Sequence, residues 1–220
     1  MILVAPMRGY ALWAATYDGA PNPLVALERR VLKDLLPDTR GKRVIDVACG
    51  TGYWTRTLHQ AGAIIFGFDN CPAMIEHANG GSFFLADAAA AAVRSETADV
   101  TLCSMAASYF TDLTKAMSEM ARITRPRGRI IVSDMHPEAM AAGWKRSFRA
   151  AQQVYEIEHR QWSEDAFRAA ARAAGLAPHA HFDEAFAEPE RALFAAAGRE
   201  HLFENVRRIP AIRITIWKRL

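Results

Sequence analysis

The fold is decided by the stretch Val44-Ile45-Asp46-Val47-Ala48-Cys49-Gly50-Thr51-Gly52, in which β-branched residues lead into two glycines. Residues 43–47 predict a buried strand, and residues 53–60 predict a helix that starts directly after the glycines. Glycine at a strand-to-helix turn lets a ligand approach the backbone closely. The stretch therefore predicts a strand, a ligand-binding turn and a helix, with the Asp46 carboxylate inside the end of the strand.

Apolar strands and helices alternate along the chain around this unit. Further strands are expected at residues 63–68, 82–85, 99–103 and 129–133, with helices beginning at Cys71-Pro72 and spanning about 112–124. A helix is also expected to begin at Asn22-Pro23, where a capping side chain precedes a proline suited to the first turn. This alternation predicts a doubly wound, mostly parallel α/β sheet with helices on both faces, because right-handed crossovers place them there.

The last third of the chain has a less regular pattern. Ser163 and Gly175 are start and stop signals for a helix, and a further strand is expected near Phe182. Residues 184–205 are expected to form an insertion with helical tendency. The isoleucines at positions 212, 214 and 216 alternate with other side chains and predict a last strand, in an antiparallel hairpin at the sheet edge.

Composition restricts the class of protein. The 220 residues are 51% hydrophobic and 23% charged, which excludes a disordered polyelectrolyte and a scaffold held by disulfides or zinc. The net charge is only +3, and no long block of one sign accompanies it, so a nucleic-acid-binding surface is not expected. We expect a single domain over residues 1–220.

The sequence carries no signal for export or for a membrane. The apolar run from Met1 to Ala5 is ended by Pro6, well short of the roughly 20 residues that a bilayer span needs. Cys49, Cys71 and Cys103 are odd in number and lack metal-type spacing, which favours free thiols and no metal site. The predicted location is therefore the cytoplasm.

Two further acidic residues follow the next two strands. Asp69 lies 23 residues after Asp46, where a carboxylate can accept hydrogen bonds from ribose hydroxyls, and Asp87 lies where it could accept from an adenine amino group. Three acids in one pocket disfavour a pyrophosphate and suit a ligand with ammonium and sulfonium groups. A dinucleotide fingerprint also fails, because Thr55 stands at its third glycine position.

These residues resemble the class I S-adenosylmethionine-dependent methyltransferases, particularly the small-molecule branch similar to ubiquinone and menaquinone methyltransferases. The resemblance covers Val44 to Pro137, with a weaker similarity at residues 13–18, and includes the segment Arg125-Pro126-Arg127-Gly128 before a strand. It implies a Rossmann-like sheet of seven strands with S-adenosylmethionine as cofactor. The implied activity is methyl transfer to a carbon, oxygen or nitrogen of a small metabolite.

The resemblance also implies roles for individual residues. Asp46 corresponds to the acid near the methionine amino group, Asp69 to the ribose ligand, and Gly50 and Gly52 to the glycines beneath the cofactor. Asp87 corresponds to the acid beside adenine, Ala88 to a backbone contact, and Ser104 to a position beside the methionine moiety. Ala48 and Asn70 depart from the pattern, in which glycine and an apolar residue are usual, so Met74 is expected to cover the base.

Four side chains outside the cofactor motifs are candidates for closure and catalysis. Tyr10 and Tyr17 are expected to form a lid whose rings face the sulfonium cation. Tyr109 is a candidate for orienting the substrate, and His136, directly after the fifth strand of the resemblance, is a candidate base. Residues 1–37 would then be a helical lid and cap, and residues 137–206 substrate-side insertions.

Two other functions remain open at this stage. A domain that binds S-adenosylmethionine without turnover, as a sensor or interaction module, is compatible with the absence of an unambiguous base. A nicotinamide-dependent oxidoreductase is less favoured, because of Thr55 and the acids of the pocket. The pattern predicts a small-molecule acceptor and neither nucleic acid nor membrane as partner, and it leaves the acceptor atom and the oligomeric state open.

Overall fold

A computed structural model describes residues 1–19 and 21–220. Its main element is a seven-stranded sheet in the order β4-β3-β2-β5-β6-β10-β9. The strands are β2 (Arg43–Val47), β3 (Ile64–Asp69), β4 (Ser82–Leu85), β5 (Ala98–Ser104), β6 (Thr124–Met135), β9 (Leu176–Glu184) and β10 (Ile212–Arg219). Pairing is parallel from β4 to β6, and β10 runs antiparallel to both β6 and β9. The predicted sheet and its antiparallel C-terminal hairpin are confirmed.

Helices cover both faces of this sheet. One face carries α2 (Pro23–Leu35), α3 (Tyr53–Gln60) and α8 (Glu188–Ala196), and the other carries α5 (Leu113–Ile123) and α7 (Glu164–Ala173). Neighbouring strand residues point to opposite faces, so that Val44 packs under the first group and Ile45 under the second. The interior therefore consists of two hydrophobic layers separated by the sheet.

Local signals set the helix starts. The Asn22 side chain accepts hydrogen bonds from the backbone of Leu24 at 3.1 Å and Val25 at 3.3 Å, and α2 begins at the proline that follows. The Ser163 hydroxyl accepts from the Ala166 backbone at 3.1 Å and caps α7 in the same way. Both starts agree with the sequence prediction.

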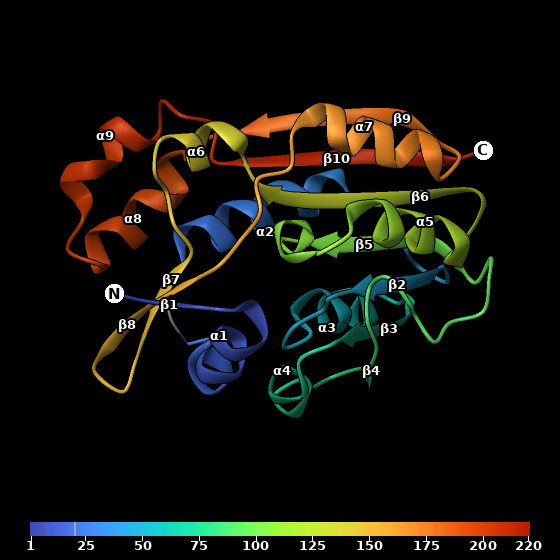
Figure 1. Ribbon diagram of the computed structural model, residues 1–220, viewed down its shortest axis with the longest axis horizontal. Coiled ribbons are helices and arrows are strands. Elements are labelled where there is room, and N and C mark those ends of the chain that lie inside the picture. The colour runs from blue at the N-terminus through green and yellow to red at the C-terminus, as the bar shows by residue number, and fades with distance from the viewer. Residues whose placement is uncertain (20) are drawn as a thin grey trace.

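A second, small sheet was not predicted. It consists of β1 (Ile2–Val4), β8 (Gln153–Ile157) and β7 (Ser147–Ala150), in that order, and α1 (Pro6–Trp13) packs against it. The Trp13 ring stacks on Phe148 with 4.8 Å between ring centroids. Figure 1 shows α1 and this sheet at the same side of the molecule as α6 (Pro137–Ala141) and α8, opposite the C-terminus.

The segment 137–206 has two parts with different places in the fold. Strands β7 and β8 belong to the small sheet, whereas α7 and β9 are part of the main sheet and its cover. The remaining short elements are α4 (Pro72–Glu76), α9 (Phe203–Val206) and the 3-10 helices η1 (Ala14–Thr16), η2 (Ala107–Tyr109) and η3 (Glu200–Leu202). Helices α8, η3 and α9 fill most of residues 188–206, which agrees with the helical tendency expected for this stretch.

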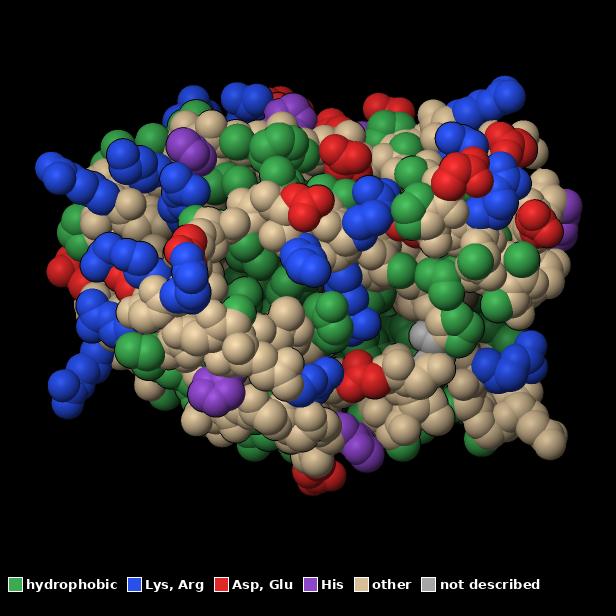
Figure 2. All heavy atoms as spheres, turned by 180° about the vertical axis from the view of Figure 1, so that it is seen from behind, with side chains coloured by type: hydrophobic (Ala, Val, Ile, Leu, Met, Phe, Trp, Pro, Cys, Tyr) green, Lys and Arg blue, Asp and Glu red, His purple; other side chains and the backbone are tan. Residues whose placement is uncertain are grey.

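The surface carries both signs of charge. Figure 2 shows a face that is hollowed near its middle, with hydrophobic side chains in the depth, and Lys and Arg side chains gather over one end of it. Within the described residues, none of the helices has the length and apolar character needed to cross a bilayer.

Candidate functional site

A cavity lies at the carboxyl ends of β2, β3 and β5, and α1 forms part of its wall. Its walls contain most of the residues singled out by the sequence, although these come from separate parts of the chain. They are Tyr10, Tyr17, Asp46, Ala48, Gly50, Asp69, Asn70, Met74, Asp87, Ala88, Ser104 and Tyr109. The topology brings them together because parallel strands end at the same edge of the sheet. Their roles toward a cofactor remain predictions.

The glycine turn has the geometry that glycine permits. Gly50 and Gly52 have φ values of 56° and 78°, in the left-handed region. Gly52 lies behind the cavity wall as the N-cap of α3, and a Cβ atom there would stand 2.4 Å from the Phe83 ring. Its role is therefore to allow close packing of the turn on β4, whereas Gly50 itself lines the cavity.

Two residues other than glycine also adopt left-handed backbone in the cavity wall. Ala48 and Met105 each have a φ of 55°, and they follow β2 and β5 at the cavity edge. A non-glycine residue in this region carries strain of order 1 to 3 kcal/mol, and such strain concentrates at functional sites. The turn at Ala48 thus keeps the backbone shape that a glycine would give, with a methyl group added.

Asp69 joins the glycine turn to the end of β3. One carboxylate oxygen accepts from the Gly50 backbone at 2.9 Å, and the other accepts from the Cys71 backbone at 2.8 Å. Burial raises the pKa of Asp69, and these backbone hydrogen bonds act in the opposite direction. Because each carboxylate oxygen has two lone pairs, the group can accept further hydrogen bonds from a ligand.

Asp46 and Glu28 form the buried floor of the cavity. Asp46 is 1% exposed and accepts from the Thr55 hydroxyl at 2.8 Å, and burial raises its pKa to about 7. Glu28 of α2 accepts from the hydroxyls of Ser104 and Ser133, both at 2.7 Å, and burial raises its pKa as well. Both groups are therefore held in an environment that disfavours an uncompensated negative charge.

The sequence reasoning missed Glu28. The signal was present, because the apolar face of the helix, with Leu24, Leu27 and Val31, includes Glu28 at helical spacing from Leu24. A carboxylate on the buried face of a helix requires a polar partner inside the protein. Here the partners are the two serines and the Trp54 ring nitrogen, which donates at 3.3 Å.

Aromatic rings cover one side of the cavity. Tyr10 meets Tyr109 edge to face at 5.3 Å between centroids, and Tyr17 lies beside Tyr10 at 6.1 Å. Trp13 is buried against the small sheet instead of facing the cavity. In the described part of the chain, the Tyr109 hydroxyl is a buried polar atom without a hydrogen-bond partner. Burial raises the pKa of Tyr109, and the neighbouring Arg146 and Tyr10 act in the opposite direction.

His136, the candidate base, does not line this cavity. It is 2% exposed, caps α6, and its Nδ1 accepts from the Glu138 backbone at 3.1 Å. Its Nε2 lies 3.0 Å from an Arg213 guanidinium nitrogen and 3.2 Å from the Asp183 carboxylate. Because the buried ring is engaged at both nitrogens and lies outside the cavity lining, the structure gives no support to His136 as a base for chemistry in the cavity.

Asp87 lies at the rim and differs from the other two acids. Its side chain is exposed and accepts from the Ala89 backbone at 2.7 Å. Arg29 is the one Lys or Arg side chain in the cavity wall among the described residues, and its guanidinium lies 3.4 Å from the centroid of the Tyr53 ring. The cavity therefore has a predominantly acidic interior.

An acidic cavity beside a glycine turn at the carboxyl edge of a doubly wound sheet is typical of nucleoside-binding proteins of the Rossmann-like class. A family model described as "Methyltransferase domain" matches residues 25–181. The chain belongs to this methyltransferase family, as the sequence resemblance predicted.

Known proteins agree with this assignment. Malonyl-[acyl-carrier protein] O-methyltransferase of Serratia marcescens is 30% identical over 129 residues, covering 56% of this chain and 49% of the relative. Demethylmenaquinone methyltransferase of Renibacterium salmoninarum is 29% identical, covering 50% of this chain and 48% of the relative. The chain thus spans about half the length of these curated relatives.

The fold has close counterparts among solved structures. The crystal structure of an S-adenosylmethionine dependent methyltransferase from Mesorhizobium loti superposes with a TM-score of 0.70 at 21% identity. The match covers 90% of this chain and 100% of that chain. This likeness establishes the shared fold.

Proposed function

We propose that the protein transfers the methyl group of S-adenosylmethionine to a small-molecule acceptor. The observation that carries the proposal is the set of three buried carboxylates, Glu28, Asp46 and Asp69, in the wall of one cavity. A ligand with ammonium and sulfonium groups compensates these charges, whereas a pyrophosphate would add to them. The cavity therefore favours S-adenosylmethionine over a nicotinamide dinucleotide.

The residues present fit this cofactor. Asp69 retains lone pairs for the ribose hydroxyls after its two backbone hydrogen bonds. The turn at Gly50 leaves space above the backbone, and Met74 lies buried beside it with its terminal methyl carbon 3.1 Å from the position of a Gly50 Cβ. The rings of Tyr10 and Tyr17 can shield a cation from water.

The cofactor, when bound, supplies a methyl group on a good leaving group. The work of the chain is then to hold donor and acceptor in a reactive geometry, an effect that contributes about 7 to 11 kcal/mol in favourable systems. Tyr109 is suited to orient the acceptor, because it lines the cavity and carries its hydroxyl beside Tyr10 and Arg146. In this proposal a general base is not required.

The proposal specifies the acceptor only as a small molecule. The two relatives have names that specify different acceptors, a malonyl group on a carrier protein and demethylmenaquinone. The proposal leaves the acceptor atom as carbon, oxygen or nitrogen, because several hydroxyls and the carboxylates Glu28 and Asp46 all line the described cavity wall. A sensor that binds the cofactor without turnover is the second candidate, favoured by the position of His136 away from the cavity.

Calorimetric titration with S-adenosylmethionine, S-adenosylhomocysteine and NAD⁺ tests the cofactor. We expect the two adenosyl ligands to bind and NAD⁺ to bind far more weakly, and preferential binding of NAD⁺ would refute the proposal. Incubation with methyl-labelled S-adenosylmethionine and a host metabolite extract, followed by mass spectrometry, tests for turnover. Binding without any labelled product would favour the sensor.

The two acids at the nucleoside end provide a matched pair of variants. Asp69→Asn removes a charge from a buried group that holds the turn, whereas Asp87→Asn changes an exposed group at the rim. We expect Asp69→Asn to weaken S-adenosylmethionine binding at least tenfold and Asp87→Asn to have a smaller effect. Equal affinities for Asp69→Asn and the unmodified protein would remove Asp69 from the site.

A further inference from the structure

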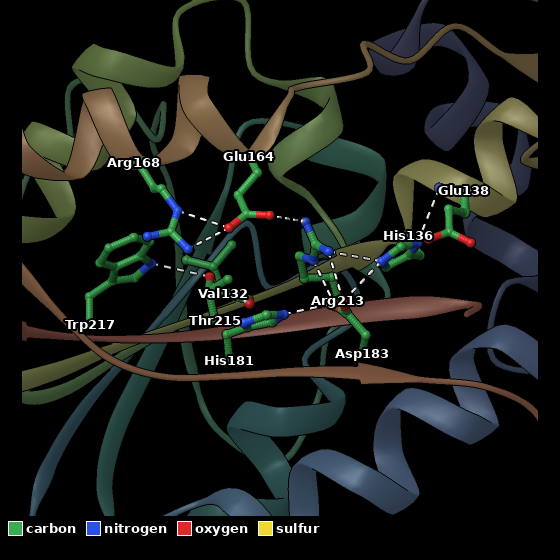
Figure 3. Close-up of polar contacts among 10 residues, drawn as sticks. All are labelled: Val132, His136, Glu138, Glu164, Arg168, His181, Asp183, Arg213, Thr215 and Trp217. Carbon is green, nitrogen blue, oxygen red and sulfur yellow. Dashed lines mark hydrogen bonds and ion pairs between the residues drawn. The ribbon is translucent and has the colours of Figure 1, made fainter. Parts of the chain in front are cut away.

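A second cavity lies on the opposite face of the sheet from α2, between β6, β10 and β9 and the covering helix α7. Its volume is about 230 Å³, and among the described residues none that lines it also lines the acidic cavity. Figure 3 shows the side chains that join α7 to this part of the sheet. The methyl-transfer proposal assigns no role to this space.

The inner wall of the second cavity is apolar and partly aromatic. Trp162, Phe167 and Trp217 line it together with Val132 and Ile216. The indole nitrogens of Trp162 and Trp217 are already satisfied, by the Ala107 carbonyl at 3.0 Å and the Thr215 hydroxyl at 3.1 Å. A cavity of about 150 Å³ with an apolar lining binds benzene, so this one has room for at least one aromatic ring.

Charged side chains at the mouth are held in an ordered row. Glu164 of α7 contacts Arg168 at 2.8 Å and Arg213 of β10 at 3.4 Å, and Arg213 pairs with both oxygens of Asp183 at 2.7 Å (Figure 3). His181 lies 3.2 Å from the same Asp183 carboxylate. These ion pairs hold α7 on the sheet. Within the row, each acidic side chain has a basic partner.

Two further basic side chains of the lining have no such compensation. In residues 1–19 and 21–220, neither Arg160 nor His179 has a side-chain hydrogen bond or a carboxylate partner, and both line the cavity. The Arg160 backbone is fixed by a 2.7 Å hydrogen bond to the Ser108 carbonyl. A positive charge at the mouth of an aromatic cavity suits a ligand with an apolar body and one anionic group.

We propose that this second cavity binds a small aromatic carboxylate, with Arg160 pairing the carboxylate and Trp162, Phe167 and Trp217 surrounding the ring. The site is separate from the acidic cavity. The helix η2 lies between them: its Ser108 lines the second cavity and its Tyr109 lines the acidic cavity. The proposal does not depend on methyl transfer. It concerns a ligand other than the cofactor.

The test is calorimetric titration of the full chain with 2-naphthoate, with and without saturating S-adenosylhomocysteine. We expect one molecule of 2-naphthoate to bind per chain in both conditions. The neutral isostere 2-naphthamide should bind on the order of tenfold more weakly, because it cannot form the charged pair with Arg160. Loss of 2-naphthoate binding when S-adenosylhomocysteine is present would place the probe in the first cavity and overturn the proposal.

Matched variants locate the probe. Arg160→Gln should weaken 2-naphthoate binding about tenfold, whereas Arg172→Gln, on the exposed side of α7 and outside the cavity lining, should leave it unchanged. Phe167→Leu removes an aromatic ring from the wall and should weaken binding of both probes. If Phe167→Leu does not fold, the exposed Arg160→Gln still decides the question. Equal effects of Arg160→Gln and Arg172→Gln, or no binding at all, would refute the site.

Discussion

Lowering the pH should weaken S-adenosylmethionine binding through Asp46. Burial raises the pKa of this carboxyl to about 7, so it is mostly ionised at pH 8 and mostly protonated at pH 6. A bound sulfonium and ammonium favour the ionised form, and the proton must leave when the cofactor binds at pH 6. For a group with this pKa, the affinity should fall about tenfold between pH 8 and pH 6, or about 1.4 kcal/mol.

Isothermal titration calorimetry at several pH values measures this change. Repetition in buffers of different ionisation enthalpy reports the proton released at pH 6. Asp46→Asn is the control, because the amide oxygen can still accept from the Thr55 hydroxyl while the group no longer titrates. The variant should bind more weakly at pH 8 and should lose most of the pH dependence.

Two results would refute this reasoning. The first is an affinity of the unmodified protein that stays constant, or rises, as the pH falls from 8 to 6. The second is the same pH dependence in Asp46→Asn, which would assign the titration to another group. S-adenosylhomocysteine, which lacks the sulfonium charge, should show a smaller pH dependence than S-adenosylmethionine, and the reverse order would also contradict the electrostatic argument.

Three further predictions concern stability and turnover. Burial raises the pKa of Asp46 from 3.8 to about 7, so the ionised carboxylate destabilises the folded state once the pH exceeds about 4. Asp46→Asn should therefore raise the free energy of unfolding at pH 8 by up to about 4 kcal/mol, measured by urea titration. This gain should shrink towards pH 4, where the carboxyl is protonated in the folded protein. Gly52→Ala should lower the free energy of unfolding by about 2 to 5 kcal/mol in thermal or urea unfolding, because the new Cβ would meet the Phe83 ring. Gly143→Ala is the control: its φ is also left-handed, at 84°, but no atom lies within 4 Å of the new Cβ, so the loss should be only about 1 to 2 kcal/mol. Equal losses in the two variants would contradict the packing argument. His136→Gln should lower stability by about 1 to 3 kcal/mol but change turnover less than twofold across pH 6 to 9, and a steep loss of turnover would restore the base hypothesis.

Much of the main sheet could be predicted because its signals are local. The helix at residues 53–60 and the strand at residues 82–85 have the predicted bounds, since glycine turns and apolar runs fix both ends. The small sheet could not be predicted in this way. Its strand β1 has three residues and pairs with β8, about 150 residues later in the chain, so no local pattern identifies the partner.

The sequence could predict those cavity residues that lie at the carboxyl ends of the parallel strands. Asp46 and Asp69 lie at the ends of the parallel strands β2 and β3, Asp87 follows β4, and the cavity wall contains all three. His136 shows the limit of this reasoning. Its position at the end of β6 indicates the correct edge of the sheet, but alternate residues point to opposite faces. Ser133 points to Glu28, whereas Asp134 lines the second cavity and His136 meets Asp183.

The acidic cavity also links ligand binding to stability. Glu28, Asp46 and Asp69 all have raised pKa values because burial disfavours their charged forms, so ionising these carboxylates costs free energy in the folded state. A cationic ligand that binds only the folded state relieves this and stabilises the fold by mass action. The same three carboxylates that select a cation should therefore make the folded state depend on that cation, more strongly at pH 8 than at pH 6.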